Sequence, residues 1–296
     1  MTRFGVHTAL ENCTVTELQD VWRRAENLGF DWVSVWDHLL PAVSPLDAGS
    51  LDSVVCHSAL ALSTNSVRVG SLVYSVGFRH PAILARAAAT IDHLSSGRME
   101  LGLGAGWNKD EYDAFGFAFE APTIRLRRLR EAVEVIRLLW NNEIVDFEGQ
   151  FYNLRDARCG VQPIQERPRI WVGASGERIG LKVVADVNDG WNCSSVTPEE
   201  LAHKHAIVMN TAANPEAIVT SVNAEYCLTD GDHDETGREG LSESRGPLVG
   251  SLNQITDNVG RFVDAGADMV VLRLVAPFRL DELEQFMFNV APWFKT

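Results

Sequence analysis

The stretch LQDVWRRAENLGFDWVSVW, residues 18–36, combines an amphipathic helix, a glycine and an apolar strand. Its apolar residues recur at the three- and four-residue spacing of a helix with one buried face: Leu18, Val21, Trp22, Ala25 and Leu28. Gly29 predicts the helix end, because glycine adopts the positive φ of a C-cap without strain. Residues 31–36 then predict a strand, so the stretch is one αβ unit.

The same order of helix, glycine and strand recurs along the chain. A helical stripe over residues 84–94 is closed by Gly97 before an apolar run at 99–104. Residues 259–263 precede Gly266 and a second apolar run at 269–274. Apolar runs of this kind suit parallel strands that are covered on both faces.

The pattern predicts eight strands, with segments between them long enough for crossover helices. We place the strands at 4–7, 31–36, 68–73, 99–104, 168–173, 189–194, 218–227 and 269–274. The 296 residues exceed the ~250 typical of a plain eight-stranded α/β barrel. We therefore predict an α/β fold in which residues 1–296 form a single (β/α)8 TIM-barrel domain with insertions after strands. A doubly wound open sheet is the structural alternative.

Composition and charge exclude several classes of partner. The formal charge of −14 repels nucleic acid and anionic lipid, and no apolar run is long enough for a signal core or a membrane span. We expect a cytoplasmic protein with a small-molecule substrate. The five cysteines are widely spaced without a CxxC pair, so they predict free thiols and no metal site.

Three segments are longer than ordinary connections: 38–50, 141–166 and 229–250. Residues 145–154 within the second predict a hairpin, which follows a helix and is expected to serve packing or dimerisation. Loops that follow strands form the active face of a barrel. We therefore expect 38–50, 105–122 and 229–250 to shape the pocket, with 229–250 as a lid.

The pair Asp37-His38 directly follows the second predicted strand, where catalytic groups of a barrel lie. A histidine there can exchange a proton with a substrate oxygen near neutral pH, and the adjacent carboxylate can orient the ring or bind a cofactor. The alternative is a loop aspartate that caps the next segment beside a hydrogen-bonded histidine. The spacing alone leaves both interpretations open.

The glycines of GLGAGWN, residues 102–108, end the fourth predicted strand and would let a flat ring approach the backbone. A dinucleotide fingerprint is not indicated, because Trp107 takes the place of its last glycine and the next strong helix is expected only near Arg125.

The run Gly173-Ala174-Ser175-Gly176 follows the fifth predicted strand and leads into a helix expected to begin near Glu177. Free backbone N–H groups and the helix dipole there could hold a phosphate, with Asn192, Ser194 and Ser195 after the next strand as further donors. A plain βα turn is the alternative.

Other candidates are less specific. His7 and Tyr74, near strand ends, are expected to line the pocket, and His93, near a helix end, to be structural. The segment Phe78-Arg79-His80-Pro81 predicts a helix start. His57, His203, His205 and His233 are given no role.

Six of these segments, in this order, resemble the bacterial luciferase-like family of flavin and deazaflavin oxidoreductases. They are residues 27–38 (NLGFDWVSVWDH), 79–81 (RHP), 88–98 (AATIDHLSSGR), 101–107 (LGLGAGW), 168–176 (PRIWVGASG) and 189–192 (DGWN). The resemblance spans nearly the whole chain, and it implies an α/β barrel that binds FMN or coenzyme F420 at the strand carboxyl ends.

The resemblance also assigns roles to residues. It implies that Gly173–Gly176 and Asn192–Ser194 hold the cofactor phosphate and that Gly106, Trp107 and Asn108 line its ring. Asp37 is assigned to cofactor or proton chemistry, and His38 to the face where hydride moves. A bulge with a cis peptide bond at Ser71-Leu72 is expected to support the ring from behind.

The Asp37-His38 pair and the glycine blocks favour F420 over FMN, because they look closer to the deazaflavin members. Lys109, Arg79 and Arg178 are candidate partners for the acidic F420 tail, with solvated surface charge as the alternative. The predicted reaction is hydride transfer between the deazaflavin C5 and an alcohol or carbonyl, imine or activated alkene, with His38 exchanging a proton. An FMN-dependent monooxygenase that uses O2 and a non-enzymatic cofactor-binding protein are the rivals. Members of the family are often homodimers, so a homodimer is expected.

Overall fold

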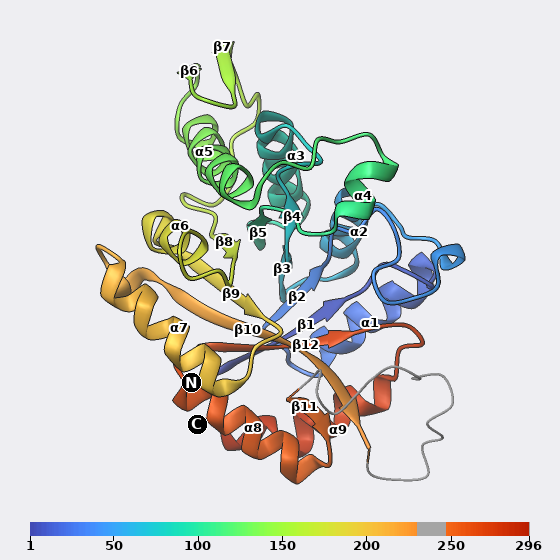
Figure 1. Ribbon diagram of the computed structural model, residues 1–296. Helices are drawn as coiled ribbons and strands as arrows, with labels where there is room; N and C mark the ends of the chain where they lie inside the picture. The colour runs from blue at the N-terminus through green and yellow to red at the C-terminus, as the bar shows by residue number, and fades with distance from the viewer. Residues whose placement is uncertain (230–246, 296) are drawn as a thin grey trace.

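Eight parallel strands close into a barrel in the computed structural model, which describes residues 1–229 and 247–295 (Figure 1). The barrel strands are β1 (Arg3–Thr8), β2 (Trp32–Val35), β3 (Arg68–Ser71), β5 (Met99–Gly104), β8 (Ile170–Gly173), β9 (Gly190–Ser194), β10 (Val219–Leu228) and β12 (Met269–Leu274). Each pairs with the next in that order, and β12 pairs with β1. The prediction of a (β/α)8 barrel is confirmed. The open-sheet alternative is wrong, because pairing between β9 and β10 completes the ring.

A helix follows each barrel strand and packs on the outside of the barrel (Figure 1). These helices are α1 (Val15–Asn27), α2 (Ser53–Ser63), α3 (Pro81–Leu94), α5 (Pro122–Asn141), α6 (Gly180–Val187), α7 (Pro198–Thr211), α8 (Leu252–Asp264) and α9 (Leu280–Asn289). The glycines that predicted helix ends, Gly29, Gly97 and Gly266, have φ values of 82°, 82° and 98°. These conformations favour glycine, so the sequence pattern located three helix ends correctly.

Large aromatic side chains fill the amino-terminal half of the barrel. The rings of Trp32 and Trp171 lie 5.9 Å apart, and the Trp171 indole N–H donates a 2.6 Å hydrogen bond to the buried Glu100. A Cβ at Gly70 would lie 2.3 Å from the Trp32 ring, and one at Gly190 would lie 2.7 Å from the Trp171 ring. The floor is therefore packed, and space remains only toward the carboxyl ends of the strands.

Several short elements decorate the barrel. The predicted hairpin is confirmed as β6 (Val145–Glu148) and β7 (Asn153–Ala157), which project beyond α5 in Figure 1. The others are β4 (Tyr74–Ser75), β11 (Leu248–Gly250), α4 (Lys109–Ala114), η1 (Leu46–Ala48), η2 (Pro215–Ala217) and η3 (Ala291–Trp293). Residues 230–246 of the expected lid at 229–250 lie outside the described residues. No helix in the described ranges is both long and apolar enough to span a bilayer.

Several boundaries differ from the sequence-based expectation, and those near the site matter most. The strand expected at 68–73 ends at Ser71, because the chain bulges before pairing again with β5 as β4. The helix expected near Glu177 begins at Gly180, after a turn. The segment after Asn108 is already helical as α4, and α5 begins at Pro122 instead of Arg125.

Candidate active site

A cavity of about 540 Å³ opens at the carboxyl ends of the barrel strands. Loops that are far apart in sequence meet there because parallel strands end at the same edge. Ten of the thirteen predicted site residues line it: Asp37, His38, Leu72, Gly106, Trp107, Gly173, Ala174, Ser175, Asn192 and Ser194. Ser71, Asn108 and Gly176 are not among the lining residues. His7 lines the cavity as expected, whereas Tyr74 is buried behind it.

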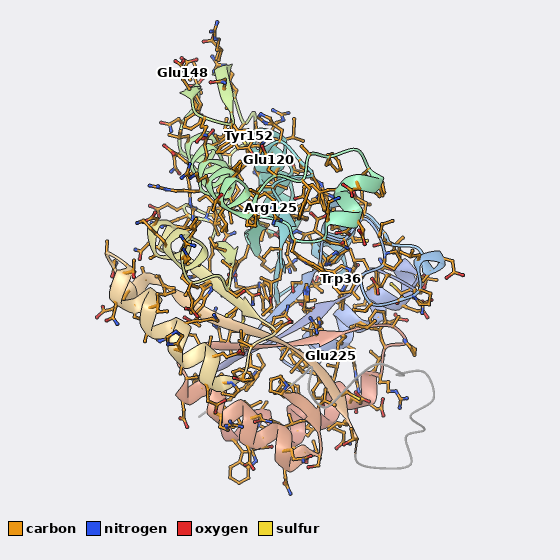
Figure 2. All side chains as sticks on the ribbon, in the orientation of Figure 1. Trp36, Glu120, Arg125, Glu148, Tyr152 and Glu225 are labelled. Carbon is orange, nitrogen blue, oxygen red and sulfur yellow. The ribbon has the colours of Figure 1, made fainter. Side chains whose placement is uncertain are left out.

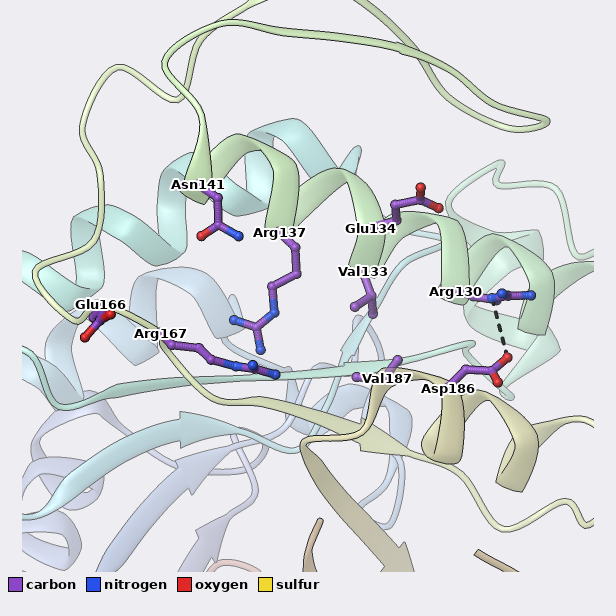
Figure 3. Close-up of a pocket in the computed structure, with 9 residues that line it drawn as sticks. All are labelled: Arg130, Val133, Glu134, Arg137, Asn141, Glu166, Arg167, Asp186 and Val187. Carbon is purple, nitrogen blue, oxygen red and sulfur yellow. Dashed lines mark ion pairs between the residues drawn. The ribbon is translucent and has the colours of Figure 1, made fainter. Parts of the chain in front are cut away.

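A second hollow, of about 610 Å³, lies outside the barrel between α5 and α6 (Figure 3). Arg130 and Asp186 form an ion pair across it at 3.6 Å. Arg137 donates to Asp189 and to the Pro168 carbonyl oxygen, and so ties α5 to the starts of β8 and β9. None of the predicted site residues lines this hollow. The candidate site is therefore the smaller cavity inside the barrel mouth.

His38 is held by a residue that the sequence did not single out, Glu111 on α4. Its Nδ1 lies 3.0 Å from Oε1 of Glu111, and the same oxygen accepts the backbone N–H groups of Leu39 and Leu40. Burial opposes the charged carboxylate, but His38 and these N–H groups lower the pKa of Glu111 below its ordinary value. No motif spacing links positions 38 and 111, so the pair becomes visible only in three dimensions.

Aromatic rings bracket His38. The Trp36 and Trp107 ring centroids lie 5.0 and 5.7 Å from that of His38, both edge to face. The Nε2 atom of His38 makes no hydrogen bond within the described chain, and the residue lines the cavity. The imidazole is thus fixed on one side and available to a ligand on the other.

Asp37 lies next to His38 in sequence but makes different contacts. Arg79 Nη1 donates to both of its carboxylate oxygens, at 2.7 and 2.8 Å. The Ser75 backbone N–H and the Ser53 hydroxyl also donate to it, and its side chain is 1% exposed. The expected orientation of His38 by Asp37 is corrected, because Glu111 makes that contact. Arg79 is likewise unavailable to a cofactor tail, because the buried Asp37 holds it.

The bulge after β3 shapes the cavity wall. Its cis peptide bond joins Leu72 and Val73, one residue later than the expected Ser71-Leu72. A Cβ at Gly102 would lie 1.9 Å from the Ser71 carbonyl oxygen, and one at Gly104 would lie 2.4 Å from Val73 Cγ2. These glycines therefore make room for the bulge, where the sequence had suggested room for a ring.

In the segment Gly106-Trp107-Asn108, the first two residues line the cavity and the third supports a neighbouring helix. A Cβ at Gly106 would lie 2.1 Å from the Tyr112 hydroxyl, and Arg125 donates to the Gly106 carbonyl oxygen. Trp107 lies at the cavity with 67% of its surface exposed. Asn108 instead caps α4 by accepting the Asp110 N–H at 3.2 Å.

The loop after β8 keeps the expected hydrogen-bonding capacity. The backbone N–H groups of Ser175 and Gly176 have no acceptor within the described chain, and both residues are exposed. Ser194 and Ser195 line the cavity close by, at the end of β9. The side-chain amide of Asn192 donates one of its two N–H groups to Ser221 Oγ at 2.9 Å, and the residue lines the cavity.

The other two cations expected to meet the cofactor tail differ in their contacts. Lys109 forms an exposed ion pair with Asp113, whereas Arg178 is exposed with no ion pair among the described residues. The Nε2–H of His93 donates to the Gln162 carbonyl oxygen at 2.8 Å, in keeping with a structural role.

Like Glu111, two polar residues of the cavity wall were missed, Arg273 on β12 and Asn223 on β10. Both line the cavity from within strands, where the sequence pattern gave no sign of a functional role. His7 lies near Arg273, and burial, followed by the charges of Arg273 and His38, lowers its pKa to about 3. The His7 ring is therefore neutral at pH 7.

Sequence relatives cover this chain to different extents. An F420-dependent glucose-6-phosphate dehydrogenase from Kineococcus radiotolerans is 36% identical, over 65% of this chain and 56% of the relative. A second such dehydrogenase, from Amycolatopsis mediterranei, is 34% identical over 68% of this chain and 60% of the relative. The chain thus spans less than two thirds of these relatives. One from Intrasporangium calvum is 29% identical over 99% of this chain and 98% of the relative.

Solved structures share the fold at lower identity. An F420-dependent secondary alcohol dehydrogenase in complex with an F420-acetone adduct superposes with a TM-score of 0.85 at 20% identity, covering 98% of each chain. The coenzyme F420-dependent tetrahydromethanopterin reductase from Methanopyrus kandleri gives a TM-score of 0.84 at 18% identity, covering 99% of each. The family model described as luciferase-like monooxygenase matches residues 1–235. The chain therefore belongs to the luciferase-like monooxygenase family.

Proposed function

We propose that the protein is an F420-dependent oxidoreductase that transfers hydride between the deazaflavin C5 and a small organic substrate, an alcohol or carbonyl, an imine or an activated alkene. The observation that carries the proposal is His38, whose Nδ1 is held by Glu111 while its Nε2 is free at the cavity. The F420-dependent relatives support the choice of cofactor.

The cavity offers suitable groups along its wall for such a cofactor. The free N–H groups of Ser175 and Gly176, with the hydroxyls of Ser194 and Ser195, would hold its phosphate. The bulge at Leu72-Val73 and the segment 104–107 would support its ring. Bound there, F420 supplies or accepts a hydride as a two-electron carrier.

His38 would handle the proton that accompanies this transfer. In alcohol oxidation its Nε2 accepts the hydroxyl proton, and in carbonyl reduction it returns that proton to the oxygen. Glu111 fixes the Nδ1–H tautomer that leaves Nε2 as the acceptor, and its negative charge stabilises the imidazolium that forms. Trp36 and Trp107 limit the rotation of the ring by packing against it.

The cofactor is tested first by titrating apo-protein with oxidised F420, reduced F420 and FMN, followed by protein fluorescence. Micromolar or tighter binding of F420 with no comparable binding of FMN is expected. Tight FMN binding together with oxygen consumption would replace the proposal with a monooxygenase. If the protein binds F420 but no substrate oxidises or reduces the bound cofactor, the protein is a cofactor carrier.

The role of His38 is tested by His38→Ala. General acid–base groups contribute about 10²–10⁴-fold to turnover. Turnover should therefore fall by a factor in that range. The affinity for F420 should change by less than about threefold, because the imidazole of His38 does not hold the cofactor phosphate. A parallel loss of both quantities would assign His38 to cofactor binding.

We also propose a homodimer in the cytoplasm. Exposed apolar side chains on the adjacent helices α2 and α3, Val55, Leu62 and Ile83, give a face that a second copy could cover. The five free cysteines are typical of a reducing compartment. Sedimentation of the wild type and of Leu62→Glu tests the assembly, and a monomeric wild type would contradict it.

A further inference from the structure

One cation faces the cavity, the guanidinium of Arg273. Among the described residues that line the cavity, Arg273 is the only arginine or lysine. It extends inward from β12, directly opposite Glu225 in the register of β10 and β12. On β12 it is separated by β10 and β9 from the free N–H groups after β8, where a cofactor phosphate would bind, whereas Asn223 on β10 pairs with Ser194 at the end of β9.

The charge of Arg273 is already balanced. Its Nη2 lies 3.4 Å from Oε2 of Glu225, and the two side chains are 22% and 13% exposed. His7, the neighbouring titratable group, is neutral at pH 7. Figure 2 places Glu225 near the centre of the molecule, as it does the cavity residue Trp36, whereas the hairpin residues Glu148 and Tyr152 lie far from both. The cavity therefore offers a substrate no uncompensated positive charge from the described residues.

Two buried polar atoms beside this ion pair have no partner. They are Nε of Arg273, which is a donor, and Oδ1 of Asn223, which is an acceptor. Asn223 is 4% exposed and lies two residues before Glu225 on β10, so both side chains face the barrel interior. Buried polar groups are nearly always hydrogen-bonded in native proteins, so an orphaned donor and acceptor at a ligand cavity indicate that a ligand satisfies them.

We propose that Arg273 and Asn223 form the substrate-recognition subsite and that it selects an uncharged hydroxyl or carbonyl compound over a phosphorylated or carboxylated one. A hydroxyl both accepts and donates, so this class of compound has the groups that the unpartnered Arg273 Nε–H and Asn223 Oδ1 need. A phosphate would bring negative charge beside Glu225, with no free cation among the described lining residues to offset it, and burying an unpaired charge is costly. This inference rests on the proposed function, and it distinguishes the chain from relatives named for glucose 6-phosphate.

The proposal is tested with matched compounds on F420-loaded protein. The pairs are glucose with glucose 6-phosphate, glycerol with glycerol 3-phosphate, and propan-2-ol with lactate, supplemented by small ketones. Binding is followed by tryptophan fluorescence and turnover by the absorbance of oxidised F420. The neutral members should bind at least about tenfold more tightly than their charged counterparts. Preference for a charged member, or binding of no neutral member at all, overturns the proposal.

A charge-removing variant makes the test specific to these residues. Glu225→Gln leaves Arg273 unpaired, so the ratio of charged to neutral affinity should rise by about tenfold. Glu199→Gln is the matched control, because it removes the same charge from a glutamate–arginine pair on the outside of the barrel, with Arg261. If the ratio of charged to neutral affinity changes equally in both variants, or does not change in Glu225→Gln, the assignment of Arg273 to the substrate subsite is wrong.

Asn223→Ala provides an independent variant that leaves every charge in place. It should weaken binding of the neutral compounds about tenfold without improving the charged ones, because only the acceptor is lost. Unaltered neutral affinity in this variant also overturns the proposal. F420 affinity is measured on each protein: failure of the wild type to bind F420 refutes the proposed function, whereas normal F420 binding with an unchanged substrate preference refutes the subsite alone.

Discussion

The Nδ1 atom of His38 and the Oε1 atom of Glu111 lie 3.0 Å apart although the residues are 73 positions apart in sequence. The glutamate side chain is 2% exposed, and it also accepts the backbone N–H groups of Leu39 and Leu40. One carboxylate thus fixes both the ring of His38 and the backbone that follows it. This relationship joins the loop after β2 to the short helix α4 across the cavity mouth.

Glu111→Gln is expected to lower kcat by about 10–100-fold, in the range seen when a residue that orients a functional histidine is removed. The amide keeps the volume and can still accept the backbone N–H groups, but it cannot stabilise an imidazolium at His38. F420 affinity and KM should change little. A pH profile of kcat separates this positioning role from a structural one, because its shape should change when the negative charge beside His38 is removed.

Asp113→Asn is the control for this prediction, because Asp113 lies on the same helix and makes an exposed ion pair with Lys109. It should leave kcat and its pH profile unchanged. A loss of turnover in Asp113→Asn equal to that in Glu111→Gln would show that any disturbance of α4 suffices.

The fold was predictable because its signals are local. Each αβ unit carries a helical stripe, a glycine and an apolar run within about two dozen residues, and Gly29, Gly97 and Gly266 indeed have positive φ. The closure of the barrel was inferred from the strand count, and pairing of β9 with β10 confirms it. Local periodicity is sufficient here because strands and helices recur in a fixed order.

The site was predictable only in outline. Strand ends located His38, Trp107 and the loop at 173–176, since position along a strand determines which end of the barrel a residue reaches. Glu111 and Arg273 were missed, because their roles depend on contacts between distant segments that no local pattern encodes. The glycines at 102 and 104 were recognised, but the atoms that fill their space, Ser71 O and Val73 Cγ2, come from a distant segment that no local pattern reveals.

Gly102→Ala is expected to destabilise the fold by about 1–3 kcal/mol, the usual cost of overpacking. Its Cβ would lie 1.9 Å from the Ser71 carbonyl oxygen, so the backbone of the bulge would have to move. Calorimetry should therefore show a lower Tm, and F420 affinity should fall because the bulge lines the cavity. Gly260→Ala on α8 is the control, since a Cβ there would lie 3.6 Å from Phe294 Cε1, an ordinary van der Waals distance, and the residue is not part of the cavity wall. Equal stability of the two variants would contradict this account of the bulge.

Asp37→Asn tests whether Asp37 stabilises the fold or takes part in the reaction. Removing one partner of a buried ion pair leaves the other charge uncompensated and costs about 3–5 kcal/mol, so urea unfolding should show a loss of that size. Asp52→Asn is the comparison, because the exposed Asp52 contacts the same Arg79 at 3.4 Å and asparagine still caps α2. Asp52→Asn should lower the free energy of unfolding by less than about 1 kcal/mol. If Asp37→Asn abolished turnover at unchanged stability, Asp37 would belong to the chemistry instead.

Acid stability is expected to depend on Glu26, which closes the turn before β3. Its carboxylate accepts the backbone N–H groups of Asn65, Ser66 and Val67. Burial raises its pKa, but these hydrogen bonds outweigh that effect and lower the pKa to about 2. Because the folded value lies below the ~4.3 of an unfolded glutamate, the stabilisation is present above that pH and is lost as pH falls toward 2. Glu26→Gln should therefore lower the free energy of unfolding at pH 7 and have a smaller effect at pH 3, as measured by urea titration at both values. Glu134→Gln, at an exposed position on α5, should show neither effect, and a Glu26→Gln deficit that grows on acidification would contradict the linkage.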